Sequence, residues 1–87
     1  MFDLFNEPYL APDNVQTADP WACWRDGCAI SKANVIPAGW ASAGTQSLVD
    51  AVRSTGAKNV ILLGGLAYAN DLSDWLGHRP QDPEGQL

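Results

Sequence analysis

Apolar residues gather in three short blocks of this 87-residue chain, and each block predicts one element of regular structure. Residues 2–6 predict a strand, residues 40–55 a helix and residues 60–63 a second strand. The first strand is expected to end at Pro8, because proline has no N–H to give to a ladder and its ring fixes φ. A strand, a helix and a strand in this order predict two parallel strands joined by a right-handed crossover.

The predicted helix and second strand carry different apolar patterns. Leu48, Val49 and Val52 follow one another at spacings of three and four residues, so they form one stripe of a helix. Gly56 follows the predicted helix end, where φ is often positive. Residues 60–63 are apolar at every position, which is typical of a parallel strand that is covered on both faces. The fold class predicted from these patterns is α/β.

Between the first strand and the helix, residues 11–37 are predicted to form a long loop. They are rich in Pro, Asp, Asn, Gly and Ala and have no sustained period. A loop of this length is unusual in a compact domain and is usually functional or disordered. After the second strand we expect a loop at residues 66–70, a short helix at residues 72–76 and a coil-like tail at residues 78–87.

Charge and hydropathy exclude two classes of partner. The net charge is −5 and the isoelectric point is near 4.3, and the five basic residues are scattered along the chain. Nucleic acid is therefore an unexpected partner, whereas a neutral polymer suits an acidic surface. No run approaches the roughly 18 apolar residues of a membrane span, so no membrane partner is expected either.

Cys23 and Cys28 are the two cysteines of the chain, and they stand five residues apart. Together with the distant His78 they supply too few ligands for zinc, which usually takes four. Their spacing is not that of a Cys-x-x-Cys redox motif. A local disulfide in the loop is favoured, and it would imply an oxidising, extracellular setting. Two unpaired thiols are the alternative, and His78 is expected at the surface.

The segment Asn6-Glu7-Pro8 carries the candidate chemistry. A carboxylate held at the end of a strand, beside an amide that can donate a hydrogen bond, is suited to act as a catalytic acid. The plainer interpretation is a solvated glutamate at a strand exit, since short motifs match by chance.

Three stretches resemble glycoside hydrolase family 5, the family of cellulases and endo-β-1,4-glucanases. They are residues 2–9, residues 39–57 and residues 59–65. The resemblance implies that the chain is an internal fragment of a (β/α)8 TIM barrel, covering the fourth strand, the fourth helix and the fifth strand. It also implies that Glu7 is the general acid/base and that Asn6 binds the sugar 2-hydroxyl.

The same resemblance makes residues 11–37 an active-site loop, because loops that leave the carboxyl ends of barrel strands build the site. The candidate substrate-binding aromatic residues are Tyr9, Trp21, Trp24 and Tyr68. Aromatic faces stack on β-glucoside rings, whose axial C–H bonds meet the negative π face. Packing of these side chains against the fold is the alternative for each tryptophan and for Tyr68.

The resemblance also implies that half of the site is missing. Retaining hydrolysis needs two carboxyl groups, and the family's nucleophile is a glutamate of the seventh strand. The chain has one other glutamate, Glu84, in a context that does not match, while Asp71 and Asp74 have the context of a helix start. We therefore expect the isolated chain to be inactive on polysaccharide and to need the remainder of the barrel, which takes roughly 250 residues.

Further expectations follow from the fragment interpretation. Met1 is taken as an internal residue of a secreted enzyme whose signal peptide lies outside this sequence. The expected substrate is a β-1,4-glucan, and neither a metal nor an organic cofactor is expected. Two other functions stay open: a non-catalytic carbohydrate-binding module that uses the loop tryptophans, and a nucleotide-binding half-domain that uses Gly64-Gly65. The latter lacks the G-x-G-x-x-G pattern.

Overall fold

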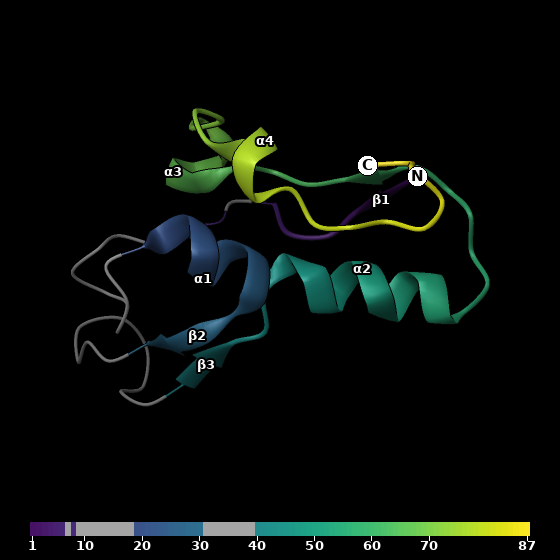
Figure 1. Cartoon of the computed structure of the whole chain (residues 1–87), viewed down its shortest axis with the longest axis horizontal. Helices are drawn as coiled ribbons and strands as arrows, with labels where there is room; N and C mark the ends of the chain where they lie inside the picture. Colours follow the sequence, from purple (N-terminus) through teal and green to yellow (C-terminus); the bar gives the residue numbers. More distant parts are fainter. Residues whose placement is uncertain (7, 9–18, 31–39) are drawn as a thin grey trace.

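The computed structural model describes residues 1–6, 8, 19–30 and 40–87, with the backbone alone for Ile30 and Trp40. Four strands and four helices lie in this part of the chain (Figure 1). In chain order they are β1 (Phe2–Asp3), α1 (Pro20–Asp26), β2 (Cys28–Ile30), β3 (Trp40–Ser42), α2 (Thr45–Ser54), β4 (Ile61–Leu62), α3 (Leu66–Ala69) and α4 (Trp75–His78).

Strands β1 and β4 form a two-stranded parallel sheet, as the sequence predicts. Phe2 pairs with Ile61 and Asp3 with Leu62. Both strands are shorter than predicted, although hydrogen bonds continue beyond them: the N–H of Leu4 donates to the carbonyl of Leu62 at 3.4 Å. Parallel strands place their carboxyl ends at one edge, so the segments after β1 and after β4 leave the sheet on the same side.

Helix α2 begins at Thr45, later than the predicted start at residue 40. Residues 40–42 instead form β3, which pairs antiparallel with β2; Ala29 lies opposite Ala41. Between β3 and α2 the backbone of Gly44 approaches that of Gly27 so closely that a Cβ on Gly44 would clash with it. Both glycines have positive φ, 83° at Gly27 and 81° at Gly44, so both the space and the conformation favour glycine.

The prediction of a continuous loop over residues 11–37 is wrong for the described residues 19–30, which contain α1 and β2. Asp19 is the N-cap of α1, where its Oδ1 accepts the N–H of Ala22 at 3.0 Å, and Pro20 occupies the first turn. Aspartate at the N-cap and proline in the first turn both favour a helix start. At seven residues α1 is too short to show a helical period, which explains why the pattern did not predict it.

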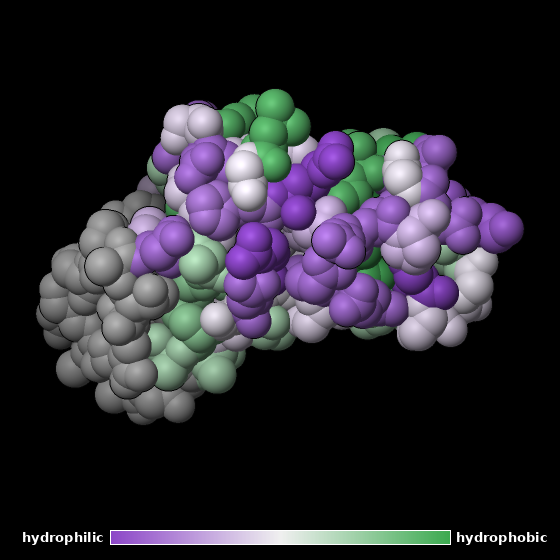
Figure 2. Space-filling model, in the orientation of Figure 1, coloured by the Kyte–Doolittle hydropathy of each residue, from purple (hydrophilic) through white to green (hydrophobic). Residues whose placement is uncertain are grey.

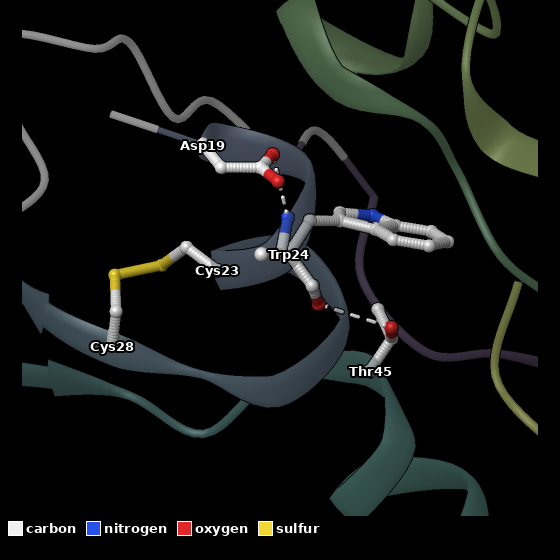
Figure 3. The surroundings of a disulfide bond; sticks show 6 residues. Asp19, Cys23, Trp24, Cys28 and Thr45 are labelled. Carbon is white, nitrogen blue, oxygen red and sulfur yellow. Dashed lines mark hydrogen bonds between the residues drawn. A yellow bond between two sulfur atoms is a disulfide. The ribbon is translucent and has the colours of Figure 1, made fainter. Parts of the chain in front are cut away.

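The predicted disulfide between Cys23 and Cys28 is present, with the two Cα atoms 5.1 Å apart. It joins the last turn of α1 to the first residue of β2 (Figure 3). Gly27 lies between them and donates its N–H to the carbonyl of Cys23 at 2.8 Å, which ends the helix. The disulfide therefore fixes the direction in which the chain leaves α1.

A tryptophan cluster, consisting of Trp21, Trp24 and Leu66 with Leu63 and Trp75 packed against them, forms the core beside α1. The Trp21 and Trp24 rings meet edge to face, with centroids 5.3 Å apart. Trp24 also accepts a hydrogen bond on its carbonyl from the hydroxyl of the buried Thr45, at 3.0 Å (Figure 3). This contact fastens the end of α1 to the start of α2.

The segments after β4 differ in part from the prediction. Residues 66–69 are labelled α3, but Ala67 and Tyr68 have non-helical backbone angles, with φ of 49° and 58°, so this segment is an irregular turn where a loop is predicted. The short helix expected at residues 72–76 lies at Trp75–His78 instead. Beyond α4 the chain has no helix or strand up to residue 87, in agreement with the predicted coil. This tail runs back along the sheet (Figure 1), and the carbonyl of Gln86 accepts the N–H of Ile61 at 2.8 Å.

The tail is held by an ion pair between α2 and the segment after Pro80. Arg53 Nε lies 2.7 Å from Asp82 Oδ1, and Arg53 Nη2 lies 2.8 Å from Asp82 Oδ2. The two side chains are only 7% and 2% exposed. Arg53 and two backbone N–H groups, those of Glu84 and Gln86, hold the pKa of Asp82 far below its usual range. Asp82 is therefore ionised at neutral pH.

One face of the β1–β4 sheet is open. Successive residues of a strand point to opposite faces, and here Ile61 is fully buried while Leu62 is 43% exposed. Within this chain the strand is therefore covered on one face, although its apolar pattern is typical of a strand covered on both. Figure 2 shows hydrophobic areas over the paired strands and beside α4. The large apolar side chains left exposed are Met1, Phe2, Phe5, Val60, Leu62, Tyr68, Leu72 and Leu76.

Candidate functional site

The candidate site lies where β1 and β4 end side by side. The segment after β1 holds the exposed Asn6 and the buried Pro8, and the segment after β4 begins with Leu63-Gly64-Gly65. A backbone hydrogen bond of 3.0 Å, from the N–H of Tyr68 to the carbonyl of Pro8, joins the two segments. A Cβ on Gly64 would lie 3.5 Å from Pro8 Cδ, so the Pro8 ring lies close to the backbone of Gly64. We call this junction the carboxyl edge.

Glu7 and Tyr9, two of the predicted site residues, lie outside the described residues. The structure does describe Asn6 and Pro8, the two residues next to Glu7 in the chain. Asn6 is exposed three residues beyond the end of β1, and Pro8 is buried close to Gly64 in the segment after β4. The part of the site that the structure describes thus consists of Asn6, Pro8 and the residues that follow β4.

Trp21 and Trp24 are not exposed platforms, which corrects the prediction that they bind substrate. Their exposed fractions are 8% and 2%, so little of either ring face is available for a ligand in this chain. Trp24 instead donates its indole N–H to the carbonyl of Gly64 at 3.0 Å. The packing alternative therefore holds for both tryptophans, and Trp24 holds the backbone at Gly64 by its hydrogen bond.

Trp75 has a related role that the sequence did not indicate. Its indole N–H donates to the carbonyl of Leu63 at 3.1 Å, and its ring lies 6.3 Å from that of Trp24. Two successive carbonyls after β4 are thus satisfied by two indoles. Four tryptophans in 87 residues were the available signal, since indole rings with their polar N–H often gather where a backbone must be both covered and hydrogen-bonded.

Tyr68 is the predicted aromatic residue that stays accessible, with 56% of its surface exposed. It lies in α3, immediately beyond the carboxyl edge, and its backbone φ is +58°. Ala67 and Ala69 on either side also have positive φ, 49° and 65°. This conformation is rare for residues other than glycine, so the segment that presents Tyr68 is under backbone strain.

His78 is not a simple surface histidine, because it lies between two helices. Its Nδ1 is 3.1 Å from Asp74 Oδ2, its Nε2 is 3.6 Å from Asp19 Oδ2, and its ring stacks on Trp21 at 6.2 Å. The pKa of Asp19 is lowered, first by the N–H of Ala22 and also by His78. These contacts join α1 to α4 and give His78 a structural role.

The carboxylates of Asp71 and Asp74, which follow β4, contact residues close to them in the chain. Asp71 Oδ1 accepts the N–H of Ser73 at 2.8 Å, and this bond lowers the pKa of Asp71. Asp74 is the N-cap residue of α4 and contacts His78. The expected place at a helix start is confirmed for Asp74, whereas Asp71 lies in the turn that precedes α4. A carboxylate with a lowered pKa is a poor proton donor at neutral pH, so Asp71 does not replace Glu7 as the candidate acid.

Two searches of the described residues concern ligands and membranes. Within residues 1–6, 8, 19–30 and 40–87, no three side chains of His, Cys, Asp or Glu gather in a way that could hold a metal ion. No helix in the same part of the chain is long and apolar enough to cross a membrane.

Comparisons of the chain with protein-family models, with curated proteins and with solved structures found no match.

Proposed function

We propose that this chain carries the acid/base half of a retaining glycoside hydrolase that cleaves β-1,4-linked glucan. The observation that supports it best is the carboxyl edge. Parallel pairing of β1 with β4 brings Pro8, the residue that follows Glu7, next to Gly64 and Tyr68. In barrels of parallel strands this edge is where the catalytic groups stand.

The proposed chemistry divides between this chain and a partner segment. Glu7 protonates the leaving oxygen and later deprotonates the incoming water. Asn6, which is exposed at the end of β1, binds the 2-hydroxyl, a hydrogen bond that strengthens in the oxocarbenium-like transition state. The nucleophile must stand about 5–5.5 Å from the acid, and we assign it to the remainder of the barrel. The reaction needs only carboxyl groups and water.

The open face of the sheet favours a chain that is completed by other segments. Val60 and Leu62 are each 43% exposed, whereas the inward face of a complete barrel is filled by layers of branched apolar side chains. The Cys23–Cys28 disulfide favours the secreted location that was expected for the parent enzyme.

The alternative of a non-catalytic carbohydrate-binding module has less support. It depends on tryptophan faces in the segment after β1, and Trp21 and Trp24 are buried there.

A chimeric enzyme tests the proposal. Residues 1–87 replace the segment from the fourth to the fifth strand in a family 5 endoglucanase, and hydrolysis of carboxymethylcellulose is measured. The chimera should hydrolyse the polymer, and Glu7→Gln should lower the rate about 10²–10⁴-fold, the usual contribution of a general acid. The isolated chain should release no sugar.

Two results add specificity to this test. Glu84→Gln is the matched control, because Glu84 lies in the exposed tail, and it should leave the rate unchanged. Azide, a small nucleophile that needs no general base, should restore part of the activity of Glu7→Gln on a substrate with a good leaving group. An active chimera whose rate is unaffected by Glu7→Gln would refute the proposal.

A further inference from the structure

The single histidine of the chain, His78, lies where the end of α4 meets α1. Its side chain is 19% exposed, and it contacts Asp74 at the start of α4 and Asp19 at the start of α1. Its ring is stacked on that of Trp21 in α1, with the two centroids 6.2 Å apart. One side chain thus joins two helices that are far apart in the sequence.

Both ring nitrogens of His78 face oxygen acceptors. Nδ1 lies 3.1 Å from Asp74 Oδ2 and 3.3 Å from the backbone carbonyl oxygen of Asp74. Neither oxygen can donate a hydrogen bond, so Nδ1 carries a proton. Nε2 lies 3.6 Å from Asp19 Oδ2, while Asp19 Oδ1 accepts the N–H of Ala22 (Figure 3).

This arrangement suits the charged form of the ring. A neutral imidazole has one N–H, so a ring that donates from Nδ1 would turn the lone pair of Nε2 toward the carboxylate of Asp19. The imidazolium directs an N–H toward each carboxylate instead. Protonation of His78 therefore changes the contact with Asp19 from repulsion to attraction.

The other charged groups near the ring do not cancel this effect. On α1, Arg25 and Asp26 form their own ion pair at 2.7 Å. The pKa of Asp26 is lowered first by Arg25 and also by the charge of His78. Arg79 follows His78 in the chain, but it lines a hollow formed with residues of the tail. Among the groups that the structure describes, two unpaired carboxylates thus face the ring from α1 and α4.

We propose that His78 is a pH-sensitive latch, which fastens α4 to α1 while the ring is protonated and releases it when the ring loses its proton. Histidine is the side chain that ordinarily changes charge between about pH 5 and pH 8. An unfolded histidine titrates near about pH 6.5. The latch therefore stabilises the folded chain below that pH, and its contribution is lost as the pH rises through neutrality. This inference does not depend on the proposed hydrolase activity.

The release should be confined to one end of α4. Trp75, the first residue of α4, donates its indole N–H to the carbonyl of Leu63 and packs against Trp24. These contacts involve no group that titrates near neutral pH. Loss of the latch would therefore loosen the end of α4 that leads into the tail, and would leave the beginning of α4 in place.

Urea denaturation of the 87-residue chain between about pH 5.5 and about pH 7.5 tests the latch. The unfolding equilibrium constant of wild type should rise about two- to fivefold over this range, the size expected for ion pairs of partly exposed groups. The side chains of Asp19 and Asp74 are 54% and 55% exposed. In His78→Gln, which cannot be charged, this rise should be absent.

Variants of the two carboxylates show whether the pH dependence comes from the contacts described above. Asp19→Asn and Asp74→Asn should each remove part of the pH dependence, and asparagine at position 19 still caps α1. Asp50→Asn is the matched control, because it removes the same charge from α2, where Asp50 contacts Gln46. It should leave the pH dependence unchanged.

An NMR titration locates the release. The ring signals of His78 are unambiguous, because the chain has no second histidine. The indole signal of Trp21 should shift with the same midpoint as the His78 ring, whereas that of Trp75 should shift much less.

Two results would overturn the latch. One is an equal pH dependence of stability in wild type and His78→Gln, and the other is a pH dependence that both aspartate variants retain in full. If His78→Gln does not fold, the aspartate variants decide, since they keep the ring. Activity of the chimeric hydrolase is measured separately, so failure of either proposal leaves the other standing.

Discussion

The tryptophan cluster and the β1–β4 sheet are built from similarly apolar residues, yet one is closed and the other is open. Trp24, Leu66 and their neighbours come from segments far apart in the sequence and cover one another. The sheet is covered on the side of Ile61 and exposed on the side of Val60 and Leu62. The two regions meet after β4, where the indoles of Trp24 and Trp75 hydrogen-bond to the backbone.

The closed region is stabilised by contacts within the chain, whereas the open region leaves an apolar surface that another segment or protein can cover. The closed region has its buried polar groups satisfied: within the described residues, no buried side-chain nitrogen or oxygen lacks a hydrogen-bond partner. The open region exposes contiguous apolar side chains, which mark interaction sites more often than chance. We therefore expect mutations in the tryptophan cluster to act on folding, and mutations on the open face to act on association.

The largest effect is expected from Trp24→Ala. Trp24 is 2% exposed and contacts both Trp21 and Trp75, so its removal leaves a large cavity. Deleting a buried aromatic side chain costs about 3–5 kcal/mol of unfolding free energy. Urea denaturation followed by circular dichroism would measure the loss, and it should come close to unfolding the chain.

Trp24→Phe is the matched control. It keeps an aromatic ring but removes the indole N–H that donates to Gly64. A loss of about 1–3 kcal/mol is expected, because the carbonyl is left without its partner. If Trp24→Ala and Trp24→Phe destabilised the chain equally, the hydrogen bond rather than the packing would be the main contribution of Trp24.

A smaller effect is expected from breaking the disulfide. Cys23 and Cys28 close a loop of only a few residues, and a short loop restricts the unfolded chain by about 2 kcal/mol in the entropic account. The double variant Cys23→Ser with Cys28→Ser should lower the unfolding free energy by that amount. Adding a reductant should destabilise wild type similarly and leave the double variant unchanged; any effect on the double variant would show that the reductant acts elsewhere.

The Arg53–Asp82 pair predicts a specific dependence on pH. The folded-state pKa of Asp82 is lowered from 3.8, chiefly by the hydrogen bonds from Arg53. A lowered folded pKa means that the contribution to stability is fully present above the unfolded value and is lost as the pH falls through the folded value. Unfolding free energy should therefore decline as the pH drops below about 4.

The control for this dependence is Asp82→Asn, which cannot ionise. It should be less stable than wild type at neutral pH, and the difference should shrink steadily as the solution is acidified below the unfolded pKa of 3.8. Parallel denaturation series at neutral and acid pH measure both. A constant difference across the whole range would mean that Asp82 does not carry the acid sensitivity.

The smallest effect on stability is expected on the open face. Leu62→Ser replaces a side chain that is 43% exposed, and surface substitutions away from special features change stability within about 0.5 kcal/mol. Its effect should appear instead in association, measured as a lower sedimentation coefficient at high concentration or a higher solubility. A large loss of stability would mean that Leu62 belongs to the folded core after all.

Much of the scaffold could be predicted because its signals are local and repeated. The apolar run at residues 60–63 and the stripe of Leu48, Val49 and Val52 predicted the β4 region and α2, and both exist. Their order also predicted the parallel pairing of β1 with β4, which is confirmed. The strand lengths could not be predicted, because they depend on which neighbouring backbones are present to continue the ladder.

Other elements were not predicted, because they do not depend on local patterns in the sequence. Helix α1 has fewer than two full apolar repeats, and the antiparallel pairing of β2 with β3 joins residues that are distant in the chain, such as Cys28 and Ser42. Residue 40 belongs to β3 rather than to the predicted helix, because the backbone there pairs with β2, with Ile30 opposite Trp40. The positive φ angles of residues 67–69 occur where Asn70 and Pro8 hydrogen-bond to this segment, and no propensity of Ala67 or Ala69 predicts them.

The candidate site was predicted less well than the scaffold. The disulfide is confirmed, Asn6 and Tyr68 are exposed at the carboxyl edge, and Glu7 and Tyr9 lie outside the described residues. The expected platforms Trp21 and Trp24 are buried. Sequence shows that an aromatic residue is near a site but not which way its ring faces, because a large ring can bury itself or bind a ligand with similar ease.

The attachment of the tail to β4 has a consequence for the order in which the chain opens. Strand β4 is hydrogen-bonded to β1 on one side and, through Ile61, to Gln86 on the other. Release of the tail would uncover a pairing edge on β4 before the closed region loosens, since proteins open in separate cooperative units. Amide hydrogens of residues 80–87 should then exchange with deuterium sooner than those of α2, and the partly opened form is the species most exposed to edge-to-edge aggregation.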